Sequence, residues 1–271
     1  MWLRSRATEP PMDLVVAIGG YLNTAAVLGR RTGELHVQMS GAAEDGEAFR
    51  PEPYTAADLS ATAVAMREHA EEQLALLAAS APALDDRTRE LAQAVLERRE
   101  ELLQQIDELR ELSDGAIRIR CHGDYHLGQV LVTEGDIVIF DFEGEPARPI
   151  AARRAKCSPL RDVAGMMRSF SYAALTALHA ATVTRPEDLP RLQPWADVWE
   201  TWVTAVFLRA YLDAAVPDRV LPGKADDREA LLHAFTLEKA LYELAYELNN
   251  RPDWVHIPLW GILRLRSPLR A

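Results

Sequence analysis

The chain has 271 residues, of which 48% are hydrophobic and 26% are charged, so it has ample material for a folded core. Its formal net charge of -11 argues against general binding to nucleic acid or to an anionic membrane surface. The two cysteines, Cys121 and Cys157, make neither a disulfide framework nor a metal-ligand spacing, and we expect a cytoplasmic setting.

The N-terminal part predicts a short lead-in followed by a buried helix. Residues 1–12 are polar and contain prolines, and we expect them to be disordered or to form a linker. Asp13 is suited to cap a helix from Leu14 to Met39, with a bend at Gly19-Gly20. The apolar stretch at the start of this helix is shorter than the roughly 20 residues that span a bilayer. We therefore expect no membrane partner.

Two long helices follow in the predicted order of elements. Thr55 is a suitable N-cap for the first, and Pro82 ends it. Asp85 or Asp86 restarts a helix that ends near Gly115, which is a suitable C′ residue. Their charged side chains are best interpreted as solvated faces.

Three short apolar-rich runs in the middle of the chain predict strands: Ile117–Arg120, Val130–Val132 and Ile137–Phe140. The turn signal Glu134-Gly135-Asp136 between the last two predicts a β-hairpin. Because a hairpin returns the chain to where it began, it would bring Asp141 close to the polar loop that precedes it.

A cluster of polar residues interrupts these strands: His122, Asp124, His126, Gln129, Asp141 and Glu143. Burying that much unpaired charge is costly, so a shared partner such as a metal ion is expected. Oxygen ligands suit Mg²⁺, which takes one or two protein carboxylates and leaves positions for phosphate and water. The pattern predicts a hard-cation site with a spare base beside it.

A basic segment, Arg153–Asp162, follows the hairpin and contains four cations in its first nine residues. The pattern is compatible with a solvated loop, with a segment that approaches phosphate, or with one that neutralises the carboxylates upstream. Ser158 is a suitable N-cap and Pro159 a suitable first residue for a helix that runs to about Ala181.

The C-terminal part is predicted to be helical, with helices over Leu192–Val216 and Asp227–Asn249. Lys239, Tyr242 and Tyr246 are spaced by three and four residues, so they share one helix face. On spacing alone this face is structural. The chain as a whole is predicted to be α+β and mostly α-helical, with one domain over residues 13–271 around a small central β-hairpin.

The loop His-Gly-Asp-x-His-x-x-Gln, with an Asp at the end of the following hairpin, resembles the catalytic loop of the aminoglycoside-phosphotransferase-like kinases. These kinases share the protein-kinase fold, so the resemblance implies a protein-kinase-like C-lobe. The stretches HGDYHLGQVL, DFEGEPARP and SPLRDVAGM resemble, more narrowly, the bacterial maltokinases. That resemblance runs from about Leu28 to Ile262. It implies transfer of the γ-phosphoryl group of ATP to maltose, with Mg²⁺ as cofactor, giving maltose 1-phosphate.

The resemblance also implies roles for the residues at matching positions. Asp124 would be the catalytic base, while His122 and His126 would shape its loop. The metal would be held by Gln129 and Asp141, with Glu143 beside them.

The remaining expected roles concern support of the loop and binding of the sugar. Asp162, near the start of a helix, would hold the backbone of the catalytic loop. The helix face with Lys239, Tyr242 and Tyr246, together with Glu247, becomes the candidate sugar contact, because tyrosines offer a flat apolar surface and a hydroxyl.

The sequence departs from the maltokinase pattern at its N-terminal side. Maltokinases carry a β-rich lobe with a lysine that contacts the ATP phosphates, whereas the lysines here, Lys156, Lys224 and Lys239, all follow the catalytic loop. We therefore expect the C-terminal lobe with the N-lobe absent, and an N-lobe or a trehalose synthase fusion partner as a candidate partner. The alternatives are a non-catalytic sugar-binding module and a kinase for another small molecule, such as an aminoglycoside, choline or a different sugar.

Overall fold

The computed structural model describes residues 10–41, 46–112, 114–146, 148–215 and 220–265. The predicted lead-in lies mostly outside the described residues. Over these residues the fold is mostly helical with two small two-stranded sheets, which confirms the prediction of an α+β, mostly α-helical chain.

The chain forms two compact units, each built from two stretches of sequence. Unit 1 consists of residues 1–53 and 116–225, and unit 2 consists of residues 54–115 and 226–271.

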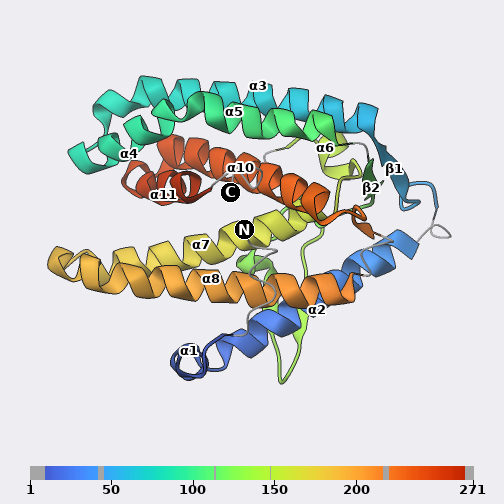
Figure 1. Ribbon diagram of the computed structural model, residues 1–271, viewed down its shortest axis with the longest axis horizontal. Coiled ribbons are helices and arrows are strands. Elements are labelled where there is room, and N and C mark those ends of the chain that lie inside the picture. Colours follow the sequence, from blue (N-terminus) through green and yellow to red (C-terminus); the bar gives the residue numbers. More distant parts are fainter. Residues whose placement is uncertain (1–9, 42–45, 113, 147, 216–219, 266–271) are drawn as a thin grey trace. The chain divides into compact units, whose positions relative to one another are not determined.

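Unit 1 is built on helices α2 (Tyr21–Gly41), α7 (Leu160–Thr182) and α8 (Leu189–Ala214). Helix α8 packs against both α2 and α7 (Figure 1). Its core includes the edge-to-face pair Phe170 and Phe207, whose ring centroids are 5.5 Å apart and whose side chains are fully buried. Aromatic pairs of this kind contribute roughly 1 kcal/mol beyond the area they bury.

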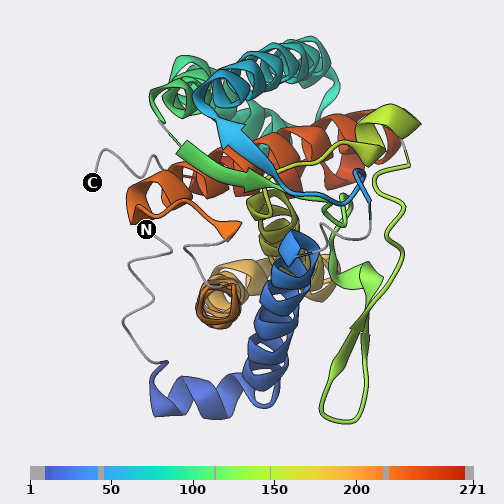
Figure 2. The same ribbon diagram turned by 90° about the vertical axis from the view of Figure 1, so that its right-hand side faces the viewer.

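The predicted bend near the N-terminus is confirmed. Helix α1 (Met12–Ile18) meets α2 at 87°, and Gly19 between them has a φ of +65° (Figure 2). Of the helices that the structure describes, none is by itself long and apolar enough to cross a membrane; α1 and α2 meet that criterion only when they are taken together across the bend.

The predicted hairpin is also confirmed. Strands β3 (Val130–Val132) and β4 (Ile137–Ile139) pair antiparallel, and Gly135 in the turn has a φ of +83°, which favours glycine. Arg31 of α2 donates two hydrogen bonds to the Asp136 carboxylate, at 2.7 and 2.6 Å. These bonds lower the pKa of Asp136 to about 2. The hairpin is thereby tied to α2.

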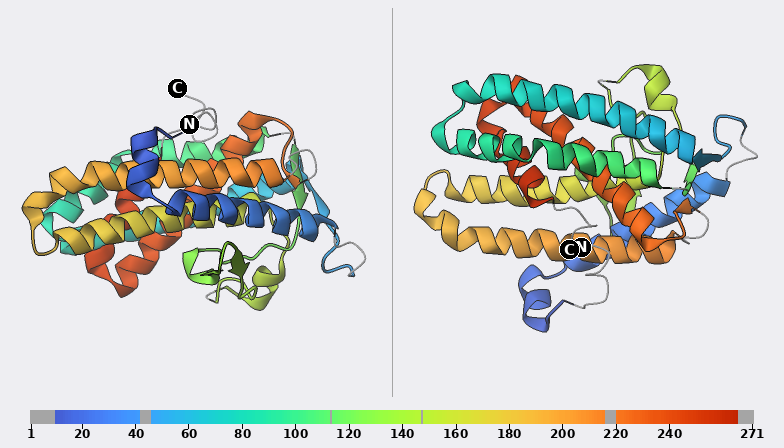
Figure 3. Two further views of the ribbon diagram at one scale, coloured as in Figure 1. Left: turned by 90° about the horizontal axis from the view of Figure 1, so that it is seen from below. Right: turned by 45° about the horizontal axis from the view of Figure 1, so that its top comes forward.

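Unit 2 contains helices α3 (Ala56–Ser80), α4 (Asp86–Glu97), α5 (Arg99–Asp107), α10 (Ala225–Asn250) and α11 (His256–Arg264). Helix α3 packs against α5 (Figure 3), and α11 packs against α4. The predicted N-cap is confirmed, because the Thr55 hydroxyl accepts a hydrogen bond from the Asp58 amide at 3.3 Å while the Asp58 carboxylate accepts one from the Thr55 amide.

The predicted role of Gly115 as the C′ residue of a helix is wrong. The helical run already ends at Glu111, and Gly115 lies in strand β2 (Asp114–Arg118), which pairs with β1 (Glu52–Thr55). A Cβ at position 115 would lie only 2.5 Å from the ring of Tyr54. Glycine is therefore needed there for close packing, and no local helix signal is involved.

Candidate active site

The polar loop at residues 122–129 lies between β2 and β3, and a carboxylate from α7 fastens its backbone. Asp162 accepts hydrogen bonds from the amides of His122, at 2.7 Å, and Gly123, at 3.0 Å. Its side chain is 2% exposed, and Gly123 has a φ of +85°, a conformation in which glycine is favoured. The structure therefore places Asp162 where the sequence predicted a support for this loop.

A histidine of α2 completes the surroundings of Asp162. The Nε2 atom of His36 lies 3.3 Å from the Asp162 carboxylate, and its Nδ1 atom lies 3.1 Å from the Tyr211 hydroxyl. Burial raises the pKa of Asp162, but the hydrogen bonds from His36 and from the two loop amides outweigh it, so the pKa lies below its usual value. No local signal in the sequence indicates this role for His36, because 126 positions separate it from Asp162.

The ring of His122 connects the loop to the hairpin. Its Nε2 donates to the carbonyl of Phe140 at 2.8 Å, and its Nδ1 accepts the amide N–H of Asp124 at 3.4 Å. These two bonds require the neutral tautomer with the proton on Nε2. The side chain of His122 is buried and both of its ring nitrogens take part in hydrogen bonds. Its assignment to shaping the loop rather than to proton transfer stays a prediction.

Asp124 is the carboxylate that the loop presents. Its side chain is 16% exposed, and its Oδ2 lies 3.8 Å from Nε2 of His126. The Nδ1 atom of His126 accepts the Gly128 amide at 3.0 Å, which leaves the Nε2–H facing Asp124. Asp124 is thus held near the surface with an N–H donor on one side.

Two further contacts fasten the loop to its neighbouring helices. The Tyr125 hydroxyl forms a 2.8 Å hydrogen bond with Thr32 of α2, and burial raises the pKa of Tyr125. On the other side, the Leu127 amide donates to the Ser169 hydroxyl of α7 at 3.0 Å. Neither Thr32 nor Ser169 carries a local sequence signal for this role.

The hairpin brings two of the predicted metal ligands together. Gln129 Nε2 donates to Asp141 Oδ2 at 3.0 Å, and the Phe140 amide donates to the Gln129 carbonyl at 3.2 Å. Asp141 has a φ of +67°, a left-handed conformation that is uncommon for a residue with a side chain. Non-glycine residues in this region cluster at functional sites.

The donor set fits Mg²⁺. The described residues contain no group of three or more His, Cys, Asp and Glu side chains arranged to hold a metal. Mg²⁺ does not need one, because one carboxylate and an amide oxygen suffice when phosphate and water supply the other ligands. Turning the Gln129 amide would present its oxygen beside the Asp141 carboxylate.

Glu143 stands apart from that pair in its contacts. Its side chain is 64% exposed and lies 4.0 Å from the guanidinium of Arg153. Arg153 of the basic segment therefore lies near one carboxylate of the upstream cluster, and the choice among the alternatives for this segment stays a prediction. The assignment of Glu143 to a metal stays a prediction.

The predicted sugar-binding residues lie in unit 2, on α10, and they fall into two contact groups. The Lys239 ammonium is 4.9 Å from the ring centroid of Tyr242. Glu247 is 1% exposed and accepts hydrogen bonds from Arg251, which also lies 5.4 Å from the ring centroid of Tyr246. Glu247 therefore has a structural partner, and the assignment of this face to the sugar stays a prediction.

Comparison with known proteins relates this arrangement to a family and to solved structures. Residues 19–195 match the phosphotransferase enzyme family (APH), which is more than half of the chain. A glucosamine kinase of Streptacidiphilus jiangxiensis is 28% identical over 86% of this chain and 47% of its own length. A glucosamine kinase of Mycolicibacterium smegmatis is 29% identical over 95% of this chain and 57% of its own length.

The solved structures agree with the sequence comparison. A glucosamine kinase in complex with glucosamine, ADP and inorganic phosphate superposes with a TM-score of 0.70 at 26% identity, over 97% of this chain and 58% of that one. A glucosamine kinase in crystal form A gives a TM-score of 0.68 at 26% identity, over 89% of this chain and 53% of that one. The chain spans about half the length of the curated relatives it matches. Together with the loop geometry above, the family match shows that the chain belongs to the phosphotransferase enzyme family, among the aminoglycoside-phosphotransferase-like kinases.

Proposed function

We propose that the chain forms the acceptor-activating part of an ATP-dependent sugar kinase, with glucosamine as the favoured acceptor. Two observations support it best. Asp162 binds the backbone of the loop that carries the Asp124 carboxylate, and the hairpin brings Gln129 into hydrogen-bond contact with Asp141. A base and a pair of oxygen ligands within one loop-hairpin element suit phosphoryl transfer to a hydroxyl group.

The choice of sugar rests on the relatives. Those described above are glucosamine kinases, and one solved structure holds glucosamine and ADP. They support the alternative prediction, a kinase for another sugar, better than the narrower resemblance to maltokinases. Maltose is therefore replaced by glucosamine as the first substrate to test, and ATP is retained as the phosphoryl donor.

In this proposal the residues of the loop divide the work between positioning and proton transfer. Asp124 accepts the proton of the attacking sugar hydroxyl, while Asp162 and His122 keep its backbone fixed. Gln129 and Asp141 would hold Mg²⁺, which supplies charge neutralisation for the phosphate oxygens when it is bound. Phosphoryl transfer needs chiefly such positioning and neutralisation of charge.

The proposal is tested with an Asp124→Asn variant of the protein. Removal of the base is expected to lower kcat by about 10²- to 10⁴-fold, the usual contribution of a general base. Glucosamine affinity should stay nearly unchanged, because the base acts on the chemical step. Product formation from glucosamine and Mg-ATP is followed by phosphorus NMR and sugar binding by calorimetry, with Glu134→Gln at the exposed hairpin turn as control.

The same assay separates the alternatives. A panel of glucosamine, maltose, glucose and an aminoglycoside should give the highest kcat/KM for glucosamine. Sugar binding with no phosphorylated product from any of them would favour the non-catalytic binding module. Turnover of Asp124→Asn at the native rate would show that Asp124 is not the base.

A further inference from the structure

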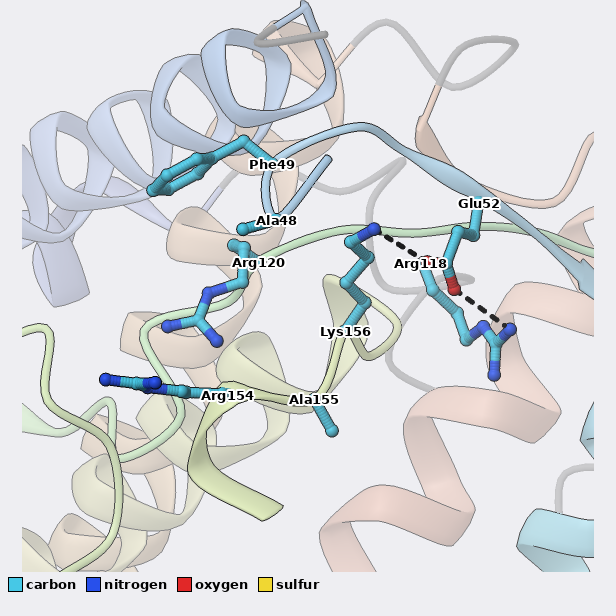
Figure 4. Close-up of a pocket in the computed structure, with 8 residues that line it drawn as sticks. All are labelled: Ala48, Phe49, Glu52, Arg118, Arg120, Arg154, Ala155 and Lys156. Carbon is cyan, nitrogen blue, oxygen red and sulfur yellow. Dashed lines mark hydrogen bonds and ion pairs between the residues drawn. The ribbon is translucent and has the colours of Figure 1, made fainter. Parts of the chain in front are cut away.

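A pocket of about 630 Å³ in unit 1 gathers positive charge (Figure 4). Its walls come from the turn after α2, from the strand that leads into the catalytic loop, and from the end of α6 (Ile150–Arg154) with the residues after it. The lining residues are Ala48, Phe49, Glu52, Arg118, Arg120, Arg154, Ala155 and Lys156. Asp124, Gln129 and Asp141 are not among them, so the pocket lining does not include the proposed base or the proposed metal ligands.

The charge of the pocket is opposite to that of the chain. Four cations and one carboxylate give the lining a net charge of +3, whereas the whole chain carries -11. Like charges gathered at one place repel one another, and an anion bound among them relieves that repulsion. The concentration of cations therefore points to an anionic ligand.

Glu52 forms ion pairs with two of the four cations, Arg118 and Lys156. Its Oε1 accepts a hydrogen bond from the Lys156 ammonium at 2.6 Å, and its Oε2 accepts one from Arg118 at 3.2 Å (Figure 4). The Lys156 side chain is only 10% exposed and also donates to the carbonyl of Glu47 at 2.9 Å. Glu52 therefore links Lys156 and Arg118 through hydrogen bonds on this side of the pocket.

The other two cations, Arg120 and Arg154, have no carboxylate partner among the residues that the structure describes. Arg120 donates a long hydrogen bond, 3.5 Å, to the carbonyl of Arg153. In Figure 4 the guanidinium groups of Arg120 and Arg154 lie on the side away from Glu52. The guanidinium groups of Arg120 and Arg154 thus lie on one side of the pocket, and no carboxylate among the described residues balances their charge.

We propose that this pocket binds the dianionic phosphate group of a small molecule. Guanidinium groups recognise phosphate through paired hydrogen bonds, and an excess of +3 suits a group that carries about two negative charges at pH 7. The volume lies within the roughly 300–1,000 Å³ of ligand pockets. Ala48, Phe49 and Ala155 add apolar lining. Inorganic phosphate and a phosphate monoester share this chemistry, and the experiment distinguishes them.

The binding test uses calorimetry on the whole protein at low ionic strength, without ATP or sugar, so its result does not depend on kinase activity. Inorganic phosphate and glycerol 3-phosphate are the two titrants. Arg154→Gln and Arg120→Gln are each expected to weaken binding of the tighter titrant about tenfold or more. Glu52→Gln is expected to strengthen it, because a competing carboxylate is removed. Arg191→Gln, an exposed arginine of unit 1 outside the pocket, is the matched control and should change affinity less than twofold.

The relative affinities of the two titrants show whether the ligand is free phosphate or a phosphate monoester. Tighter binding of glycerol 3-phosphate identifies a monoester site, and tighter binding of inorganic phosphate identifies a site for the free ion. Binding should weaken at pH 5, because the second phosphate pKa is near 6. Absence of heat with both titrants, or an equal loss of affinity in Arg191→Gln, would overturn the proposal.

Discussion

At the scale of single residues, one buried carboxylate organises the candidate active site. Asp162 receives two loop amides and His36, and its side chain is almost completely removed from solvent. A buried charge is tolerable only when such donors surround it. The position of Asp124 therefore depends on a residue that is proposed to take no part in the chemistry itself.

Replacement of Asp162 by Asn is expected to lower the free energy of unfolding by about 3 kcal/mol. The amide keeps one acceptor oxygen but turns an NH₂ group toward backbone donors, and each unsatisfied buried donor costs roughly 1–3 kcal/mol. Urea unfolding at pH 7 measures the change. Glu134→Gln, which removes an exposed charge of unit 1, should stay within about 0.5 kcal/mol of the native protein.

The destabilisation caused by Asp162→Asn is expected to depend on pH. The folded-state pKa of Asp162 lies below its ordinary value of 3.8, so its stabilising contribution is present above about pH 4 and is lost as the pH falls further. The difference in unfolding free energy between native protein and variant should therefore shrink from pH 7 to pH 3. A difference that stays constant over this range would contradict the assigned cause.

At the scale of elements, the close packing of α2 on α8 depends on glycine. A Cβ at Gly29 would lie 2.2 Å from the carbonyl oxygen of Phe207, and a Cβ at Gly33 would lie 2.8 Å from that of Tyr211. Both contacts are with backbone, which cannot move aside as a flexible side chain would. Helix α2 carries His36, Thr32 and Arg31, so its fit on α8 also determines where the loop and hairpin are held.

Gly29→Ala is expected to destabilise the protein although alanine is the better helix former. Helix propensity favours alanine by about 1 kcal/mol, whereas overpacking against backbone costs roughly 1–3 kcal/mol or more. A net loss of about 2 kcal/mol should lower Tm by roughly 4–8 °C. Gly20→Ala, where a Cβ meets nothing within 4 Å, is the control and should leave Tm nearly unchanged. An increase in Tm for Gly29→Ala would show that α2 is packed more loosely than the structure indicates.

At the scale of the whole molecule, the two units divide the predicted residues between them. The loop and hairpin lie in unit 1, and the predicted sugar-binding face of α10 lies in unit 2. Unit 2 has its own buried polar pair, in which His233 Nε2 donates to Gln105 Oε1 at 2.9 Å. Burial lowers the pKa of His233 to about 4.

His233 is the second residue, after Asp162, that is expected to make the free energy of unfolding depend on pH. Between about pH 6.5 and pH 4 the unfolded chain binds a proton that the folded chain does not, so stability falls as the pH falls through this window. The full difference corresponds to about 3 kcal/mol. Urea unfolding from pH 7.5 to pH 4 should show this decline in the native protein and a flatter profile in His233→Gln. Parallel profiles of unfolding free energy against pH for the two proteins would contradict this prediction.

Much of the secondary structure of this protein could be predicted from residues that are close together in the sequence. Caps at Thr55 and Asp85, the turn at Gly135 and the motif from His122 to Gln129 each depend on residues a few positions apart, and the structure contains the elements they predict. The physical reason is that capping, turn formation and hydrophobic periodicity act over one or two turns of chain. The sequence by itself therefore determined the helical class, the hairpin and the position of the candidate loop.

Only the tertiary structure decided which distant residues meet. His36 reaches Asp162 across 126 positions, Arg31 reaches Asp136 across 105, and Arg120 lines one pocket with Lys156. No local pattern encodes such contacts, because they arise when helices and loops pack and the free energy of burial selects their partners. The sequence predicted a loop with a base, metal ligands and Asp162 as its support. The tertiary structure added His36, which lies beside Asp162, and placed a cationic pocket in the same unit.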